Sequence, residues 1–475
     1  MRIAYISYEY PPDSSNGGIA TYVAQAARMM ARRGFKVEVF ASSPRRFGRF
    51  ESNGIVEHWI QETNRQQFGI VAGHFFAARH AEKPFDVLEG PEYNADARKA
   101  VELTPTVPLV VKMHTPSLMI ETLNAPMGAR KYLKNIYQNF RGLAASLVKR
   151  KPIQPFYYIP PSLHEAKNWD WVEATHARTA DIVAPPCQDL CRHAKVVWNV
   201  SEDAIRLAPH PFTPPKDYLE LQPKAGGLTV GFVGRLEKRK GIETLVTAIP
   251  LVLNAVPEAK FRFIGAPQKH PASGIPYDKW IRLRLPKHSD RLEFPGKYPF
   301  ERMAEAYDSL DICVFPSLWE NFPNVCLEAM SAGRAIIASS AGGIAEMLDG
   351  GRVGRLMASG DSVSLAREII SLLIAPAERI RLGELARKRV LKTYNEGVIG
   401  ELMERIYHEA IDRKGQLDTV HKLPDDTPLE KISEEIEFLM AVQQGLKALD
   451  EGRVVSHEDV KARVASWAHL LYLIE

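Results

Sequence analysis

Cysteine is scarce in this chain. Only four of its 475 residues are cysteines, namely Cys187, Cys191, Cys313 and Cys326. A disulfide framework needs many paired cysteines in a short chain, so we expect reduced thiols. A structural metal site needs paired cysteines with histidines at ligand spacing, and the sequence has no such set. We therefore expect no bound metal.

Long apolar runs and a charged leader are also missing. No segment approaches the roughly 18 uninterrupted apolar residues of a membrane span. Residues 1–12 lack the charged leader, apolar core and cleavage site of a signal peptide. We expect a cytoplasmic protein. The net charge of +4 is too small for a chain of this length to favour nucleic acid as a partner.

Two nucleotide-binding motifs are absent as well. The sequence contains neither the G-x-G-x-x-G of dinucleotide-binding folds nor the P-loop pattern G-x-x-x-x-G-K-[ST]. A dinucleotide oxidoreductase, which would share a doubly wound sheet, is therefore poorly supported.

The pattern that is present is a repeated strand, glycine loop and helix. A buried strand is expected over 2–7, an amphipathic helix over 19–33 and a second strand over 36–41. This order is typical of the parallel βαβ unit, which folds into a doubly wound sheet. Further strands are expected at 85–88, 107–113 and 181–184.

A second series of the same kind begins after a Pro- and Lys-containing stretch. A strand is expected over 228–233 and a helix from Ile242, with more strands at 261–265, 292–294, 312–315 and 335–339. The predicted class is α/β, with two doubly wound Rossmann-like domains at 1–212 and 226–395. Such domains place a ligand cleft between the carboxyl ends of their strands.

The end of the chain departs from this pattern. We expect residues 396–412 to form a helix that returns toward the first domain, and residues 413–475 to form a helical hairpin. Thr427 and Glu430 give that hairpin a capping box. We expect this hairpin to dock on the body of the protein or on a second subunit. In the second case the protein would be a dimer.

A basic glycine loop lies between a predicted strand and helix. It reads Gly-Arg-Leu-Glu-Lys-Arg-Lys-Gly over 234–241 and carries Arg235 and Lys240. A helix amino terminus already favours anions, and an arginine fork with a lysine charge suits a diphosphate. The alternative is a solvated basic turn.

Two glutamates, Glu320 and Glu328, are separated by seven residues around Pro323, which suits the first turn of a helix. We expect Glu320 at the end of a strand and Glu328 inside the helix. A carboxylate that grips vicinal hydroxyls is a common way to hold a ribose. The alternative is a surface glutamate on each side of a helix start.

Together these motifs make the sequence resemble glycosyltransferase family 4, the glycogen-synthase-like branch of the GT-B fold. The GRLxxxKG and E-x7-E patterns are both present, and the likeness covers roughly residues 1–410. It includes a glycine pair in the first domain, Gly17 and Gly18, and the stretches at 263–265 and 342–346.

The resemblance implies roles for these residues. Arg235 and Lys240 would bind the donor diphosphate and stabilise it as it leaves. Glu328 would hold the ribose and Glu320 the donor sugar. The remaining donor contacts would come from Phe322, Pro323, Asn324 and Val325. The resemblance implies that the anomeric configuration of the transferred sugar is retained. No nucleophilic side chain is agreed for this family, so we assign neither glutamate as a nucleophile.

The first domain supplies further candidates. In this family a histidine at the end of the strand occupied here by 109–113 contacts the donor sugar, which points to His114 as catalytic; a structural hydrogen bond is the alternative. Gly17 and Gly18 would let the backbone approach the diphosphate. Three residues after the preceding strand are candidates for acceptor contact, namely Glu89, Glu92 and Tyr93.

A cationic amphipathic segment lies at 130–151, where several Lys and Arg residues occur without Asp or Glu. Such a helix can lie on an anionic bilayer, which would suit a lipid-linked acceptor and a place at the inner face of the membrane. The alternative is an ordinary helix packed on the domain.

The predicted function is a retaining hexosyltransferase of polysaccharide biosynthesis type. It would move a sugar from a nucleoside diphosphate to a glycan, a lipid-linked or a small-molecule acceptor. The other glycosyltransferase fold generally holds a metal with Asp-x-Asp, and this triplet is absent, so no metal or other cofactor is expected. A nucleotide-sugar epimerase and an inactive sugar-nucleotide binder are the alternatives.

Overall fold

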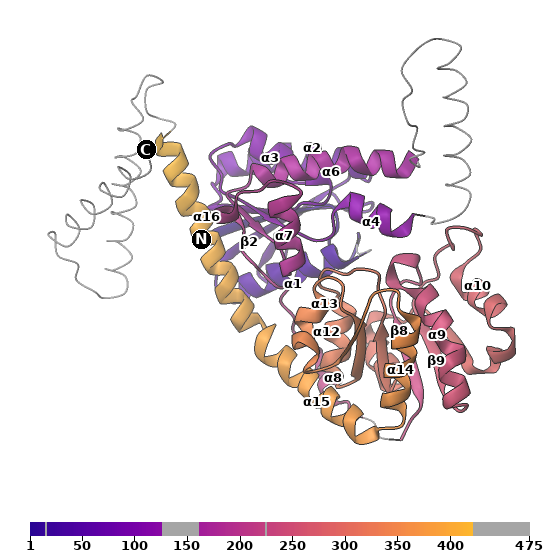
Figure 1. The fold of residues 1–475 in the computed structure, drawn as a ribbon. Coiled ribbons are helices and arrows are strands. Elements are labelled where there is room, and N and C mark those ends of the chain that lie inside the picture. The colour runs from indigo at the N-terminus through magenta and orange to yellow at the C-terminus, as the bar shows by residue number, and fades with distance from the viewer. Residues whose placement is uncertain (15–16, 126–160, 224–225, 421–475) are drawn as a thin grey trace, which may run out of the picture.

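The computed structural model describes residues 1–14, 17–125, 161–223 and 226–420 (Figure 1). These residues form two α/β domains, each with one central sheet, and a long helix that runs along both. The cationic segment predicted at 130–151 lies outside the described residues, and so does the predicted hairpin 413–475 beyond residue 420. Residues 413–420 continue the helix from Glu396 and do not begin a separate hairpin. Within the part that is described, no helix is long and apolar enough to cross a membrane.

The first sheet has seven strands in the order β3-β4-β2-β1-β5-β6-β7. All neighbours are parallel except β3 and β4. The direction of the strand order reverses between β1 and β5, and this is where ligands bind in open α/β sheets. The strands are β1 Arg2–Ser7, β2 Lys36–Ser42, β3 Gly48–Ser52, β4 Ile55–Ile60, β5 Val87–Pro91, β6 Leu109–Lys112 and β7 Ile182–Ala184.

The β3–β4 hairpin was not predicted. Its turn is Asn53-Gly54, with positive φ angles of 53° and 75°, as a tight hairpin requires. Strand β3 is almost entirely exposed and has no apolar alternation, so periodicity gives no signal for it.

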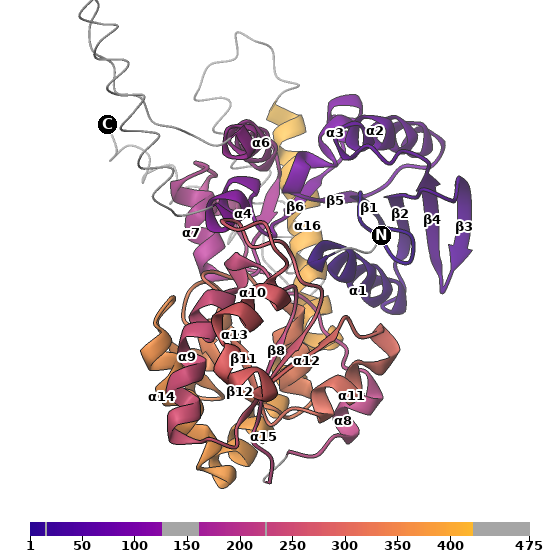
Figure 2. The same cartoon turned by 90° about the vertical axis from the view of Figure 1, so that its right-hand side faces the viewer.

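Helices cover both faces of this sheet (Figure 2). The first, α1, buries Tyr22, Val23, Ala26 and Met30 on one face, and Gly34 takes a positive φ of 91° just beyond its end. The helices of the domain are α1 Gly18–Arg32, α2 Arg65–Glu82, α3 Arg98–Leu103, α4 Ser117–Asn124, α6 Pro161–Arg178 and α7 Gln188–Val196, with short 3₁₀ turns η1 Tyr93–Ala95 and η2 Glu202–Ala204.

The second sheet has six parallel strands in the order β10-β9-β8-β11-β12-β13. Its order reverses between β8 and β11. The strands are β8 Thr229–Val233, β9 Lys260–Ile264, β10 Leu292–Gly296, β11 Ile312–Phe315, β12 Ala335–Ser339 and β13 Arg355–Met357. The main helices are α8 Lys216–Glu220, α9 Ile242–Ala255, α10 Tyr277–Arg284, α11 Met303–Asp308, α12 Asn324–Ser331, α13 Ile344–Met347, α14 Ser362–Leu373 and α15 Pro376–Thr393.

The helix α16, Glu396–Val420, leaves the second domain and packs on the first (Figure 1). Its apolar side chains, among them Ile399, Met403 and Ile406, are buried in the same core as β1 and α1. An ion pair between Arg206, in the segment after η2, and Glu409 of α16 adds a second contact between this helix and the first domain. The first domain therefore contains the last described helix of the chain.

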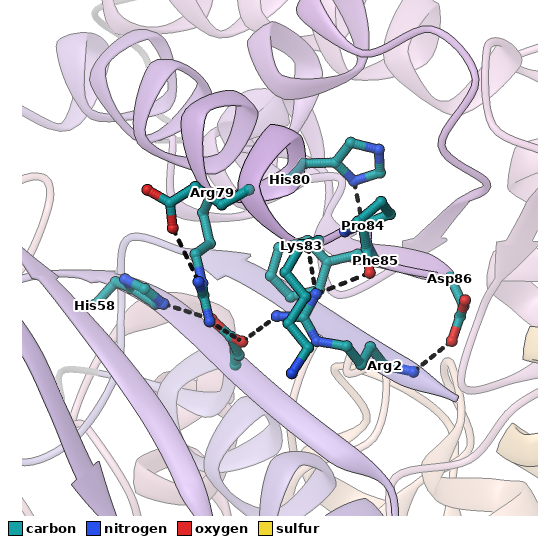
Figure 3. Close-up of polar contacts among 10 residues, drawn as sticks. Arg2, His58, Arg79, His80, Lys83, Pro84, Phe85 and Asp86 are labelled. Carbon is teal, nitrogen blue, oxygen red and sulfur yellow. Dashed lines mark hydrogen bonds and ion pairs between the residues drawn. The ribbon is translucent and has the colours of Figure 1, made fainter.

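A buried carboxylate, Glu38 on β2, gathers three hydrogen-bonding partners from β1, β4 and α2. Figure 3 shows Arg2, His58 and Arg79 pointing toward one shared carboxylate, which the hydrogen bonds identify as that of Glu38. His58 Nε2 lies 2.7 Å and Arg79 Nε 3.0 Å from its Oε2, and Arg2 pairs with its Oε1. Burial alone raises the pKa of a carboxyl, but these partners outweigh burial and hold the pKa of Glu38 well below its ordinary value.

This cluster predicts a pH-dependent contribution to stability. Glu38→Gln should lower the free energy of unfolding at pH 7 by about 3 kcal/mol, because it leaves buried cations unpaired. The folded pKa is depressed, so the contribution is present above the ordinary glutamate pKa of about 4.3 and is lost as pH falls below it. Urea unfolding at several pH values measures this. Glu51→Gln, on the exposed strand β3, is the control, and equal stability of the two variants would contradict the prediction.

Candidate active site

Two loops of the second domain touch backbone to backbone. One follows β8 and spans 234–241; the other follows β11 and spans 316–323. Gly241 has a φ of 71°, and a Cβ there would lie 1.8 Å from the carbonyl oxygen of Pro316. Gly265, with a φ of 143°, would in the same way meet the Gly234 carbonyl at 1.9 Å. Only glycine fits at 241 and 265, and Gly234, which opens the basic motif, itself takes a φ of 142° that favours glycine.

Glu320 lies beneath the basic loop as a buried anion with 4% of its surface exposed. Lys240 Nζ pairs with its Oε1, and Arg239 Nη1 donates to the same oxygen at 2.9 Å. Burial raises the pKa of a carboxyl, but the two cations outweigh burial and hold the pKa of Glu320 below its ordinary value. Glu320 is therefore a carboxylate that accepts hydrogen bonds.

Arg239 and Glu237 were not among the predicted residues. Arg239 is 6% exposed and bridges Glu320 to Glu237, whose Oε1 accepts from Nη2 at 2.9 Å. Both residues occupy variable positions of the GRLxxxKG pattern, and their side chains turn inward only because the loop folds over Glu320. The pattern gives no signal for that.

Arg235 is placed differently from Arg239 and Lys240. Its side chain is 54% exposed, and its nearest ion-pair partner is Glu237 at 3.6 Å. Among the described residues the guanidinium therefore keeps donors free, whereas Arg239 and Lys240 of the same loop are paired with buried carboxylates. An arginine in this position suits an anion that arrives from outside the domain.

Glu328 lies on α12, eight positions after Glu320. Tyr307 donates its hydroxyl to Glu328 Oε2 at 2.7 Å, and the same hydroxyl lies 3.2 Å from the carbonyl of Val325. Burial raises the pKa of Glu328. No side chain in the described ranges bonds its other oxygen, which therefore stays available to a hydroxyl donor.

The segment between the two glutamates only partly fits its predicted role. The amide of Phe322 donates to Asn321 Oδ1 at 2.5 Å and its ring is buried, so this amide already has a partner within the loop. Pro323 precedes the first residue of α12. Asn324 carries a buried Oδ1 with no partner among the described residues.

His114 follows β6 and is fixed on one side. Its amide donates to Glu92 Oε1 at 2.7 Å, and its ring Nδ1 lies 3.3 Å from Glu92 Oε2 and 3.2 Å from the Lys112 carbonyl. Its Nε2 is buried without a partner in the part of the chain that the structure describes. Glu92, predicted as an acceptor contact, instead orients the imidazole.

Glu89 does not reach a position for acceptor contact. It lies inside β5, which extends to Pro91, and is 1% exposed. Its two oxygens accept hydroxyl groups from Tyr22 at 2.8 Å and from Tyr407 of α16 at 2.7 Å. The prediction was wrong because it ended this strand at Leu88. Tyr93 begins the η1 turn after β5, with the Arg65 guanidinium 4.7 Å from its ring centre.

Gly17 and Gly18 open α1. A Cβ on Gly17 would come within 3.2 Å of Glu9 Oε2, whereas a Cβ on Gly18 would meet nothing within 4 Å. The amino terminus of this 15-residue helix is therefore uncovered by other described residues at Gly18.

The two domains contact each other at these loops. Helix α4 lies against the basic loop (Figure 2): Asn124 Oδ1 accepts from the Arg239 amide at 3.2 Å, and Lys238 Nζ donates to the Ala125 carbonyl. His210 lies between the domains, with its ring centre 4.9 Å from that of Tyr22 and 5.4 Å from that of Phe322. The carboxyl ends of both sheets thus face one another.

Two family models match the chain and together span most of it. Residues 17–211 match the Glycosyl transferase 4-like domain, and residues 227–374 match Glycosyl transferases group 1. The chain belongs to glycosyltransferase family 4. Its two parallel-sheet domains and C-terminal helix are the GT-B fold, as the sequence predicted.

Curated relatives match at different lengths. The chain is 25% identical to the phosphatidyl-myo-inositol mannosyltransferase of Mycobacterium leprae, over 86% of this chain and 96% of that protein. It is 27% identical to the D-inositol 3-phosphate glycosyltransferase of Corynebacterium jeikeium, over 50% of this chain. That match spans about half of the relative, 54%. A match to Mycobacterium tuberculosis glycogen synthase, 27% identical over 43% of this chain, spans 47% of that enzyme.

Solved structures share the fold of this glycosyltransferase family member. The sucrose-phosphate synthase of Thermosynechococcus elongatus superposes with a TM-score of 0.63 at 23% identity, over 86% of this chain and 98% of that one. HepE of Anabaena, in complex with UDP and glucose, gives a TM-score of 0.57 at 16% identity over 85% and 98%.

Arg239 should contribute to the stability of the family motif. Arg239→Met leaves Glu237 without its closest cation and removes one of two cations from Glu320. We expect the free energy of unfolding to fall by about 3 kcal/mol, the cost of breaking a buried pair. Guanidinium unfolding measures it, and Arg235→Met is the control because that side chain is half exposed. Equal losses in the two variants would disprove the assignment.

Proposed function

We propose that this chain is a retaining, metal-independent glycosyltransferase that transfers a hexosyl group from a nucleoside-diphosphate sugar. The observation that carries the proposal is the loop after β8. There the buried Glu320 neutralises Lys240 and Arg239, while Arg235 stays exposed on the same loop, which contacts α4 of the first domain. The UDP and UDP-glucose complexes of HepE support a nucleotide donor.

The donor diphosphate would bind at this loop. Arg235 offers an unoccupied guanidinium fork, and Lys240 lies behind it as a point charge. Burial lowers the pKa of Lys240, and the neighbouring Glu320 carboxylate opposes that effect. Both cations would stabilise the negative charge that develops on the leaving diphosphate. Glu328 would hold the ribose through the oxygen that Tyr307 leaves unengaged.

The transfer would proceed without an enzymic nucleophile. Glu320 Oε1 is bound by two cations, which makes it a poor nucleophile and a suitable acceptor for donor-sugar hydroxyls. His114 Nδ1 faces two acceptors, Glu92 Oε2 and the Lys112 carbonyl, and so carries the ring proton, which leaves Nε2 to accept a hydroxyl group of the same sugar. The acceptor hydroxyl would attack on the face that the diphosphate leaves and pass its proton to the departing phosphate oxygen.

Donor binding should depend on the two motif cations separately. Arg235→Met and Lys240→Met are each expected to weaken binding of the preferred nucleoside diphosphate at least tenfold, since one charge-assisted hydrogen bond is worth roughly 1.5 to 3 kcal/mol. Calorimetry against UDP, GDP and ADP measures this. Lys388→Met on α15, an exposed lysine outside the loop, is the control. Unchanged affinity in Arg235→Met would refute the diphosphate site.

Turnover should need no metal and should retain configuration. We expect activity to survive EDTA, and the product to keep the donor's anomeric configuration in proton NMR. A loss that Mn²⁺ or Mg²⁺ restores would refute metal independence, and inversion would refute retention. Donor isomerisation without acceptor would instead identify an epimerase, and binding without turnover an inactive binder.

A further inference from the structure

A group of unsatisfied polar atoms lies at the switch point of the first sheet. Among the described residues, Arg65 Nε and Nη2, Asn94 Nδ2, Glu9 Oε2 and Asp96 Oδ1 are buried and have no hydrogen-bond partner. Buried polar groups in native proteins are nearly always paired, so a cluster of orphans indicates a missing ligand or water. We call Glu9, Arg65, Asn94 and Asp96 the orphan cluster.

The fold holds these side chains in fixed positions. Glu9 follows β1, and Asn94 lies in the η1 turn that follows β5. Asn94 takes a positive φ of 58°, a backbone conformation that asparagine adopts more readily than most residues. Arg65 begins α2, and its guanidinium lies 4.7 Å from the ring centres of both Tyr8 and Tyr93.

The cluster is internally cross-linked. Arg65 Nη1 donates to Glu9 Oε1 at 2.9 Å, and the Tyr8 amide donates to Asp96 Oδ2 at 2.8 Å. One oxygen of each carboxylate and one nitrogen of the arginine, Nη1, therefore already have a hydrogen-bond partner. The orphan atoms are what remains for a ligand.

The orphan cluster adjoins the proposed transfer site. Glu9 Oε2 lies next to Gly17, within 3.2 Å of where a Cβ would stand. Glu92, two residues before Asn94, binds His114 at 2.7 Å. A ligand in the cluster would thus lie on the first-domain side of the boundary, beside the histidine that faces the donor.

The charges of the cluster restrict what this ligand is. The orphans are three N–H donor atoms and two carboxylate oxygens. A phosphate would satisfy the donors but would meet the carboxylates of Glu9 and Asp96, with Glu92 close behind them, against the single cation of Arg65. An ammonium group would satisfy only the carboxylates. A hydroxyl group both donates and accepts, so a hydroxyl-rich ring serves both kinds of atom without adding charge.

We propose that the orphan cluster binds the acceptor, and that it selects a neutral, hydroxyl-rich ring over its phosphorylated form. This inference rests on the proposed function and names its acceptor class. Glu9 and Asp96 accept from ring hydroxyls, and Arg65 and Asn94 donate to them. The acceptor hydroxyl that reacts then lies toward His114.

Matched acceptor pairs test the selectivity. With the donor that binds best, transfer is measured to myo-inositol and inositol 1-phosphate, to glucose and glucose 6-phosphate, and to mannose and mannose 6-phosphate. We expect kcat/KM to be at least tenfold higher for the neutral member of each pair that reacts. Equal or better use of the phosphorylated members overturns the proposal, and so does a lack of transfer to every neutral member while donor binds.

Variants separate the acceptor site from the donor site. Glu9→Gln and Asp96→Asn should each raise the KM of the neutral acceptor about tenfold and narrow the preference over its phosphorylated partner. Their affinity for the nucleoside diphosphate should not change. Arg65→Lys keeps the charge but loses the fork, and should also raise the acceptor KM. Glu51→Gln is the control for an exposed glutamate of the same domain.

The readouts distinguish two kinds of failure. If no nucleoside diphosphate binds, the proposed function fails and this inference fails with it. If the diphosphate binds normally but the three variants keep the acceptor KM and selectivity of the parent, only the orphan cluster is refuted. Circular dichroism melting of each variant identifies any that fail to fold. If Glu9→Gln or Asp96→Asn does not fold, the acceptor KM of Arg65→Lys, which keeps a positive charge beside Glu9, tests the proposal.

Discussion

The ion pairs of the buried Glu320 carboxylate hold together the two loops that follow β8 and β11 in the second domain. The carboxylate comes from the loop after β11, and its two cations come from the loop after β8. An unpaired charge would not be tolerated at 4% exposure. The two loops must therefore keep together, and their glycines let the backbones touch. With two cations held inward in this way, Arg235 is left facing outward.

The first domain also contains buried carboxylates that are held by hydrogen bonds. Glu92 fixes His114, and Glu89 is bound by tyrosines from α1 and α16. The orphan atoms around Arg65 lie on the same edge of the sheet. On the second-domain side of the boundary, Arg235 is suited to binding a phosphate. On the first-domain side, the carboxylates disfavour a further anion.

Sequence reasoning predicted the two-sheet architecture and the family, because parallel strands are apolar runs and glycine loops stand at fixed offsets from them. It missed the β3–β4 hairpin, whose outer strand is exposed and lacks alternation. It placed Glu89 at a strand end because the apolar run stops at Leu88, although pairing with β6 continues to Pro91. Arg239 was missed for a different reason: its inward direction is a property of the loop's tertiary packing, which no local pattern encodes.

The path of α16 has a consequence for how the protein is made. Its side chains Ile399, Met403 and Tyr407 complete the core that β1 and α1 begin. During synthesis, this part of the first domain's core stays uncovered until the whole second domain and then α16 have been translated. Tyr5 and Glu89 likewise lack their partner Tyr407 until then. The two halves are separate in sequence order, yet the first reaches its final packing only after the second has been made.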